Sequence, residues 1–154
     1  MPHFTTRHTV KHSADDMFAL VADVRAYPEF VPLCESLKVR GQSPIDEGRS
    51  VVIADMTVAY KLFRETFTSR VVLDPAKRQI DVTYLDGPFR RMENRWRFEE
   101  AADGGSVIEF HIDYEFRSRA LASLMGAVFD RAFHKFSSAF EARADTLYGA
   151  ENAA

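Results

Sequence analysis

The sequence offers few groups that could perform catalysis or bind a metal, and their spacing argues against both. A nucleophilic enzyme needs a Ser or Cys beside a general base, but the only cysteine, Cys34, follows a proline-containing turn and has no histidine near it in sequence. We therefore expect Cys34 at the edge of the core. His8 and His12 share one side of a predicted strand and His111 lies on the polar face of another, which predicts surface histidines rather than metal ligands. The Gly104-Gly105 pair indicates a hairpin turn rather than a phosphate-binding loop.

Glu65 is the polar residue with the most distinctive position. Strand alternation places it with Phe63, Phe67 and Val71 on the face expected to point inward. A lone inward carboxylate is costly unless it is protonated or paired. Three interpretations stay open: a protonated Glu65 that hydrogen-bonds a ligand oxygen, an internal salt bridge, or a bulge that turns it outward. Arg143 is the candidate salt-bridge partner because it falls within the apolar stripe of the last predicted helix.

Asn94 is a second polar residue on a strand face that is otherwise apolar, since it lies two residues from both Met92 and Trp96. A buried amide needs hydrogen-bond partners. Asn94 is therefore expected either to make a structural hydrogen bond or to contact a ligand.

The composition is that of one ordinary folded domain. The chain has 154 residues, of which 46% are hydrophobic, 28% charged and 12% aromatic, and this excludes disordered, collagen-like and coiled-coil classes. A net charge of -3 gives no overall basic field for nucleic acid. A single cysteine excludes an internal disulfide framework and fits a reducing compartment. Without a long apolar run or a secretory signal, we expect a cytoplasmic protein, with peripheral contact to the inner membrane left open.

The N-terminal part of the chain predicts a strand followed by a helix. Residues 4–11 are short and rich in Thr and Val, as in a strand. Apolar residues at helical spacing predict a helix over 14–24, with Ser13 as its N-cap. The prolines in 26–32 allow at most a short helical turn.

The rest of the chain changes its periodicity once. From 37 to 116 apolar and polar residues alternate, which predicts an antiparallel meander of about six strands. From 118 to 148 the period becomes 3.6, which predicts a helix of about 45 Å with a wide apolar stripe. The fold class is therefore α+β, with a curved antiparallel sheet wrapped around the long C-terminal helix and an apolar cavity between them. We expect one domain over 1–148 and a flexible tail over 149–154.

The charges on the last two strands predict how they pair. One register sets Arg95 opposite Glu109 and Arg91 opposite Asp113, whereas the alternative sets Glu93 opposite Asp113. Because opposite charges are favourable across a strand pair, the first register is predicted.

Four stretches carry a family resemblance, residues 21–34, 65–71, 86–96 and 110–144, and within them three motifs occur together: Tyr27-Pro28-Glu29-Phe30, Asp86-Gly87-Pro88-Phe89 and the aromatic strand Phe110–Phe116. With these, the chain resembles the START-like, polyketide cyclase-like superfamily, and within it the coenzyme Q-binding protein branch. The order and spacing of the motifs match from about residue 3 to 148. Leu33 is a departure, because many branch members have Trp before the Cys, and this change affects a cavity lid or a membrane-facing edge.

The resemblance implies a helix-grip fold (START-like, Bet v 1-like) without catalytic residues, a catalytic cofactor or a metal. It also implies ubiquinone, or a similar polyisoprenyl lipid, as a bound ligand in support of respiration. Together with the inward phase of the strands and the helix stripe, it predicts a ligand cavity, although core packing is the alternative for each side chain alone. The expected lining residues are Met56, Val58, Phe63, Glu65, Phe67, Tyr84, Met92, Asn94, Trp96, Phe110, Ile112, Tyr114, Met125, Val128, Phe129 and Phe133.

Three functions follow as expectations. The first is a non-enzymatic carrier, monomeric or dimeric, that delivers ubiquinone to respiratory complexes. The second is a ribosome-association toxin of the RatA type, to which bacterial members of the branch also belong. Such a toxin needs a basic stripe for rRNA. Arg90, Arg91, Arg95 and Arg97 cluster on one hairpin, but acidic neighbours such as Glu93 should neutralise them.

The third expectation is an aromatase or cyclase acting on polyketides in the same pocket. That chemistry needs a positioned acid or base. Only Glu65, Tyr84 and Tyr114 could serve.

Overall fold

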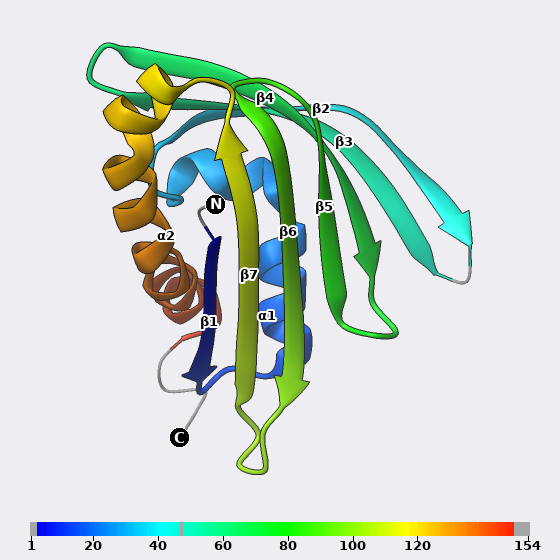
Figure 1. The fold of residues 1–154 in the computed structure, drawn as a ribbon. Helices are drawn as coiled ribbons and strands as arrows, with labels where there is room; N and C mark the ends of the chain where they lie inside the picture. The colour runs from blue at the N-terminus through cyan, green and yellow to red at the C-terminus, as the bar shows by residue number, and fades with distance from the viewer. Residues whose placement is uncertain (1–2, 47, 150–154) are drawn as a thin grey trace.

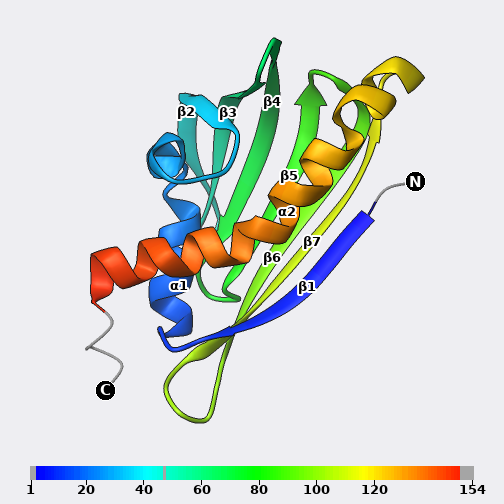
Figure 2. The ribbon, with the colours of Figure 1, turned by 90° about the vertical axis from the view of Figure 1, so that its left-hand side faces the viewer.

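The structure, a computed structural model, describes residues 3–46 and 48–149. Within this part of the chain, seven strands form one antiparallel sheet in the order β1-β7-β6-β5-β4-β3-β2. The sheet curves around the long helix α2, which lies across its concave face (Figures 1 and 2). This confirms the predicted fold class. The strands are β1 (His3–Val10), β2 (Cys34–Asp46), β3 (Arg49–Tyr60), β4 (Phe63–Asp74), β5 (Gln79–Asp86), β6 (Phe89–Glu100) and β7 (Ser106–Phe116).

Two short helical segments follow β1. Helix α1 (Ala14–Ala22) begins at the predicted N-cap, where the Ser13 hydroxyl oxygen accepts a hydrogen bond from the Asp16 N–H at 3.1 Å. The predicted helix over 14–24 is slightly too long, because the chain continues from Val24 as the 3-10 helix η1 (Val24–Glu29). Pro28 lies inside η1 and prevents a longer α-helix.

Helix α2 (Arg119–Tyr148) has the length predicted from its periodicity. Its N-cap is Ser118, whose hydroxyl accepts a hydrogen bond from the Leu121 N–H at 3.2 Å. Its apolar face packs on the sheet, and its C-terminal part passes α1 (Figure 2). Gly149 ends the helix with a φ of 80°, and residues 150–154 of the predicted flexible tail lie outside the described residues.

The alternation predicted for the last strand is confirmed by β7. Ile108, Phe110, Ile112, Tyr114 and Phe116 are all buried, while the residues between them are partly exposed. This face of β7 and the apolar face of α2 form the centre of the core.

The predicted pairing of β6 with β7 is wrong. Glu93 lies opposite Asp113, and Arg91 lies opposite Glu115. The expected Arg91–Asp113 ion pair nevertheless forms diagonally, with Nη2 and Oδ1 3.0 Å apart, and this hydrogen bond holds the pKa of Asp113 below its usual value. Because a long arginine reaches a diagonal neighbour, charge pairing did not determine the register.

The turn between these strands determines their register instead. The Ala101 N–H donates to the Gly105 carbonyl at 2.9 Å, and Gly104 takes a φ of 90° that favours glycine. This turn sets Glu100 opposite Ser106. Both registers keep the same residues on the inner face, so hydrophobic alternation could not distinguish them.

The β5–β6 turn approaches β4 so closely that it requires glycine. A Cβ at Gly87 would lie 2.6 Å from the Cβ of Phe67, and the φ of Gly87 is 145°. This contact holds the β5–β6 turn against β4 at one end of the sheet. The register of the strand pairs also shifts here, between Thr68 and Ser69 and between Phe89 and Arg91, and such irregularities increase curvature.

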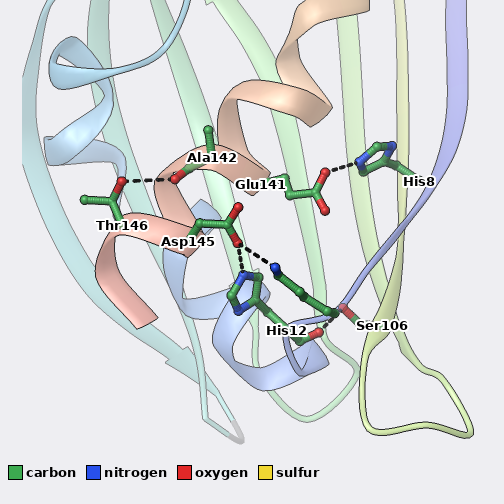
Figure 3. Close-up of polar contacts among 8 residues, drawn as sticks. His8, His12, Ser106, Glu141, Ala142, Asp145 and Thr146 are labelled. Carbon is green, nitrogen blue, oxygen red and sulfur yellow. Dashed lines mark hydrogen bonds and ion pairs between the residues drawn. The ribbon is translucent and has the colours of Figure 1, made fainter. Parts of the chain in front are cut away.

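Polar side chains fasten β1 and the following turn to α2 (Figure 3). The His8 Nε2 lies 2.9 Å from the Glu141 Oε1, and the His12 Nε2 lies 2.7 Å from the Asp145 Oδ1. His12 is only 4% exposed, so its prediction as a surface histidine is wrong. The turn after β1 carries His12 under α2, where its carbonyl also accepts a hydrogen bond from Ser106 at 2.8 Å.

Candidate ligand-binding cavity

An apolar cavity of about 120 Å³ lies between α2 and the concave face of the sheet. The inner faces of β3 to β7, the middle of α2 and the segment from η1 to β2 form its walls. Several of the predicted lining residues line it: Met56, Val58, Phe67, Met92, Asn94, Trp96, Phe110, Ile112, Phe129 and Phe133.

The other predicted lining residues lie away from this cavity. Tyr114 and Met125 are buried in the core, where the Tyr114 ring packs 5.3 Å from the Phe133 ring. Phe63, at the start of β4, packs edge-on against Phe129. Val128 is half-buried on α2. Glu65 and Tyr84 occupy the polar surroundings described next.

Glu65 lies at the rim of the sheet and does not line the cavity. Its side chain is 34% exposed, and its Oε1 lies 4.0 Å from the Arg117 Nη2. The pair lies at the surface, since the Arg117 side chain is 59% exposed, so the predicted internal salt bridge does not form and the candidate partner was wrong. Arg143 instead contacts Glu29 on η1, with Nη2 and Oε1 2.9 Å apart, and lies over the Phe30 ring.

Near the cavity, the hydroxyls of Tyr27 and Tyr84 make hydrogen bonds, and Tyr114 is buried. The Tyr84 hydroxyl accepts a hydrogen bond from the Phe89 N–H at 3.0 Å, and the Tyr27 hydroxyl donates to the Val21 carbonyl at 2.6 Å. Burial raises the pKa of Tyr27, Tyr84 and Tyr114 above the usual value. These groups are therefore protonated at neutral pH.

Asn94 makes the predicted structural hydrogen bonds and also lines the cavity. Its Nδ2 donates to the His111 carbonyl at 2.8 Å, and its Oδ1 accepts from the Trp96 Nε1 at 3.2 Å. These bonds fix the indole of Trp96, the single tryptophan of the chain, against the cavity.

The remaining lining residues were missed by sequence reasoning, for two reasons. On β3 to β5 the alternation already contained the signal, because these residues share the inward phase, whereas Phe89 on β6 is out of phase with Met92 and lies beyond the register shift between Phe89 and Arg91. On α2 they belong to the predicted stripe. The segment 24–33 has no regular period, so its side chains could not be placed, while Leu37 lies on β2, where the predicted alternation begins. The missed residues are Val24, Tyr27, Val31, Pro32, Leu33, Leu37, Ala54, Ser69, Val71, Ile80, Val82, Phe89, Ala132, Phe136 and Phe140.

The start of β2 and the residue just before it bring the cavity lining to the surface. Leu33 and Leu37 line the cavity and are half-buried. Leu33 has a φ of 70°, which is uncommon for a bulky residue, and its carbonyl accepts a hydrogen bond from the Ala59 N–H at 3.0 Å. This bond to β3 holds the strained residue at the cavity edge.

Cys34 lies at the edge of the core, as predicted. It is 7% exposed and has no disulfide partner among the described residues. Burial raises the pKa of its thiol to about 11. At neutral pH the thiol is therefore protonated and a poor nucleophile. The described residues also contain no cluster of three or more His, Cys, Asp or Glu arranged for a metal ion.

Comparison with known proteins gives a family match over most of the chain. A family model described as polyketide cyclase / dehydrase and lipid transport matches residues 10–141. The ribosome association toxin RatA of Escherichia coli K12 is 31% identical over 97% of this chain and 91% of its own length. A mitochondrial coenzyme Q-binding protein of Schizosaccharomyces pombe is 35% identical over 67% of this chain and 62% of its own length.

Solved structures show the same fold. An 18 kDa protein from Caulobacter crescentus aligns with a TM-score of 0.79 and 37% identity, covering 97% of this chain and all of its own. The Zhui aromatase/cyclase of Streptomyces sp. R1128 aligns with a TM-score of 0.80 over 97% of each chain, but at 23% identity this likeness concerns the fold alone.

Proposed function

Because the chain belongs to the polyketide cyclase/dehydrase and lipid transport family, we propose that it binds ubiquinone, or a similar uncharged polyisoprenyl lipid, in the cavity beneath α2. It would carry this lipid unchanged, in support of respiratory electron transport. The lining of the cavity carries the proposal: none of its described residues is acidic or basic, and most are apolar. The coenzyme Q-binding relative supports the same ligand class.

The energetics of an isoprenoid tail explain why a carrier is needed. Each methylene exposed to water costs about 0.8 kcal/mol, so about four isoprenoid units cost well over 10 kcal/mol. Such a lipid does not cross water freely. A protein that covers part of the chain lowers this cost.

The size of the cavity indicates which part of the lipid it holds. Its volume of about 120 Å³ is below the usual range of about 300 to 1,000 Å³ for small-molecule sites. A quinone with about ten isoprenoid units has roughly 60 heavy atoms and cannot fit. The cavity therefore receives the ring and the start of the tail, and the rest leaves past Leu33 and Leu37.

The position of the acid and base candidates supports carriage rather than chemistry. Glu65, Tyr84 and Tyr114 are the groups that the sequence offers for an aromatase or cyclase reaction, and none of them lines the cavity. A cyclase needs such a group within hydrogen-bond reach of its substrate. The geometry therefore favours a ligand that is bound and released intact.

One end of the molecule has the properties of a membrane-docking surface. The β3–β4 turn, the β5–β6 turn and the first turn of α2 all lie at this end, which is the upper end in Figures 1 and 2. Leu62, Leu85 and Leu124 are exposed there, Leu62 completely. Lys61 in the β3–β4 turn and Arg119 at the start of α2 make no ion pair with a described residue, although the Lys61 Nζ lies 5.3 Å from the centre of the Tyr60 ring. Exposed leucines next to cations without ion-pair partners fit an anionic lipid bilayer. No helix in 3–46 or 48–149 has the length and apolar character to cross it.

The docking surface predicts a position-specific effect on vesicle binding. The double variant Leu62→Asp/Leu124→Asp should lose most binding to anionic phosphatidylglycerol vesicles, because it replaces apolar anchors by charges that anionic lipids repel. Vesicle co-sedimentation measures the loss. Leu147→Asp is the matched control, because Leu147 is also exposed but lies at the other end of α2. Equal loss in both variants would contradict a specific docking end.

Trp96 provides the test of ligand binding. As the single tryptophan, it reports on the cavity that it lines. Titration with a short-chain ubiquinone should quench its fluorescence to saturation at one ligand per chain. A linear, unsaturated decrease equal to that of free N-acetyltryptophanamide would contradict binding in the cavity.

A second candidate function is action on the ribosome, which the RatA relatives favour because they match nearly the whole chain. The arginine hairpin supports it less well. Arg90, Arg91 and Arg95 have ion-pair contacts to Glu115, Asp113 and Asp81. Adding the protein to separated ribosomal subunits and following reassociation on sucrose gradients tests this role. A carrier leaves reassociation unchanged, whereas a toxin of this type blocks it.

A further inference from the structure

The cavity contains a hydroxyl group that lacks a hydrogen-bond partner. Ser69 lies on the inner face of β4 between Phe67 and Val71, and it is 7% exposed. It lines the cavity, and its hydroxyl makes no hydrogen bond to another described residue. Most buried hydroxyls are paired, because burial removes their water. An unpaired hydroxyl facing a cavity indicates that the ligand supplies the missing partner.

Asn94 places a second donor on the same cavity. Its Nδ2 carries two hydrogens, and one of them bonds to the His111 carbonyl. The other is available to a ligand. The pairings set Val71, Val82 and Asn94 in one row across β4, β5 and β6, and Ser69 is the inward neighbour of Val71 on β4. Two strand spacings, about 10 Å across the sheet, and a two-residue step of about 7 Å along β4 therefore separate the two residues.

The surroundings restrict the acceptor to a neutral oxygen. No described Lys, Arg or His lines the cavity to balance a carboxylate or phosphate. Burying such an anion here would be very costly, whereas a carbonyl or ether oxygen carries no charge to desolvate. A ring with oxygen atoms on opposite sides would span the space between the two donors.

We propose that Ser69 and Asn94 form the recognition site for the head of the ligand, an uncharged ring with carbonyl oxygens on opposite sides. The inference rests on the proposed binding function and adds to it. The Ser69 hydroxyl donates to one oxygen and the free Asn94 N–H to the other. The apolar walls then hold the start of the tail, and the polar pair determines which head is accepted.

The test compares two probes and three variants by isothermal titration calorimetry. Decylubiquinone carries the carbonyl oxygens, and decylbenzene has the same tail without them. Ser69→Ala should weaken decylubiquinone binding roughly fivefold, as expected for one net hydrogen bond, and leave decylbenzene binding unchanged. Ser69→Thr keeps the hydroxyl and should retain the affinity for decylubiquinone.

The matched control is Ser137→Ala. Ser137 is equally buried on α2 and its hydroxyl is also unpaired, but it does not line the cavity, so neither probe should be affected. Equal decylubiquinone affinity in Ser69→Ala and the unmodified protein would overturn the inference. So would a loss for both probes by the same factor, since that indicates a change of shape. If the unmodified protein binds neither probe, the proposed function itself fails.

Discussion

Replacing Ala54 by phenylalanine should strongly weaken ligand binding while leaving the protein folded. Ala54 is 5% exposed on β3 and lines the cavity. A phenyl ring at this position points into empty space and occupies the volume that the ligand needs. We expect the affinity for decylubiquinone to fall on the order of 100-fold, equivalent to about 2.7 kcal/mol. Quenching of Trp96 fluorescence measures this affinity, and urea denaturation measures the stability.

The matched control for this variant is Ala144→Phe. Ala144 is fully buried on α2 and does not line the cavity. Overpacking a filled site typically costs about 1–3 kcal/mol of stability. Ala144→Phe should therefore lower the free energy of unfolding more than Ala54→Phe does, with little effect on affinity in the folded protein. If Ala54→Phe binds the quinone normally, or is as destabilised as the control, the space beneath α2 is not the ligand site.

Removing the Trp96 side chain should have the largest effect on stability. Trp96 is 4% exposed, and its ring packs 4.6 Å from that of Phe110 and 5.1 Å from that of Phe140. Trp96→Ala should lower the free energy of unfolding by about 3–5 kcal/mol, because it removes these contacts and the donor to Asn94. Urea denaturation followed by circular dichroism measures the change, since the variant has no tryptophan fluorescence.

Trp96→Phe separates packing from hydrogen bonding. It keeps an aromatic ring near Phe110 and loses only the indole N–H and part of the volume. We expect a smaller loss than for Trp96→Ala. A Trp96→Ala protein within about 1 kcal/mol of the unmodified stability would contradict the role of Trp96 as a link between β6, β7 and α2.

The sequence predicted the elements that depend on local periodicity. The alternation from Ile108 to Phe116 identified the inner face of β7, and Ser13 was predicted as an N-cap because it precedes an apolar stripe. The register of β6 against β7 was not predictable in this way. Ion pairs form diagonally as well as directly, so the turn at Gly104 decides the pairing.

The candidate site was predicted where it is built from regular elements. Met92, Trp96 and Phe110 line the cavity because they hold the inward phase of their strands. Glu65 holds the inward phase of β4 too, but it lies near the start of that strand, where Arg117 and solvent reach it. Phase alone does not distinguish the middle of a sheet from its rim. This is also why Ser69, at the middle of β4, is the more informative polar residue.

The histidines show that sequence spacing does not predict burial beyond the end of a strand. His8 and His12 share one side of the chain, and sequence spacing assigns them the same environment. In the structure β1 ends before His12, and the following turn buries it against Asp145 (Figure 3). Burial after a turn depends on a tertiary contact that spacing does not contain.

The most direct test of the carrier function is the identity of the lipid that the protein holds. Freshly purified protein should be extracted with organic solvent and the extract analysed by mass spectrometry, with Ala54→Phe purified in parallel. We expect an uncharged polyisoprenyl quinone, near one per chain, in the unmodified protein and a strong depletion in Ala54→Phe. An extract without such a lipid, or with equal amounts from both proteins, would contradict the proposal that this cavity carries it.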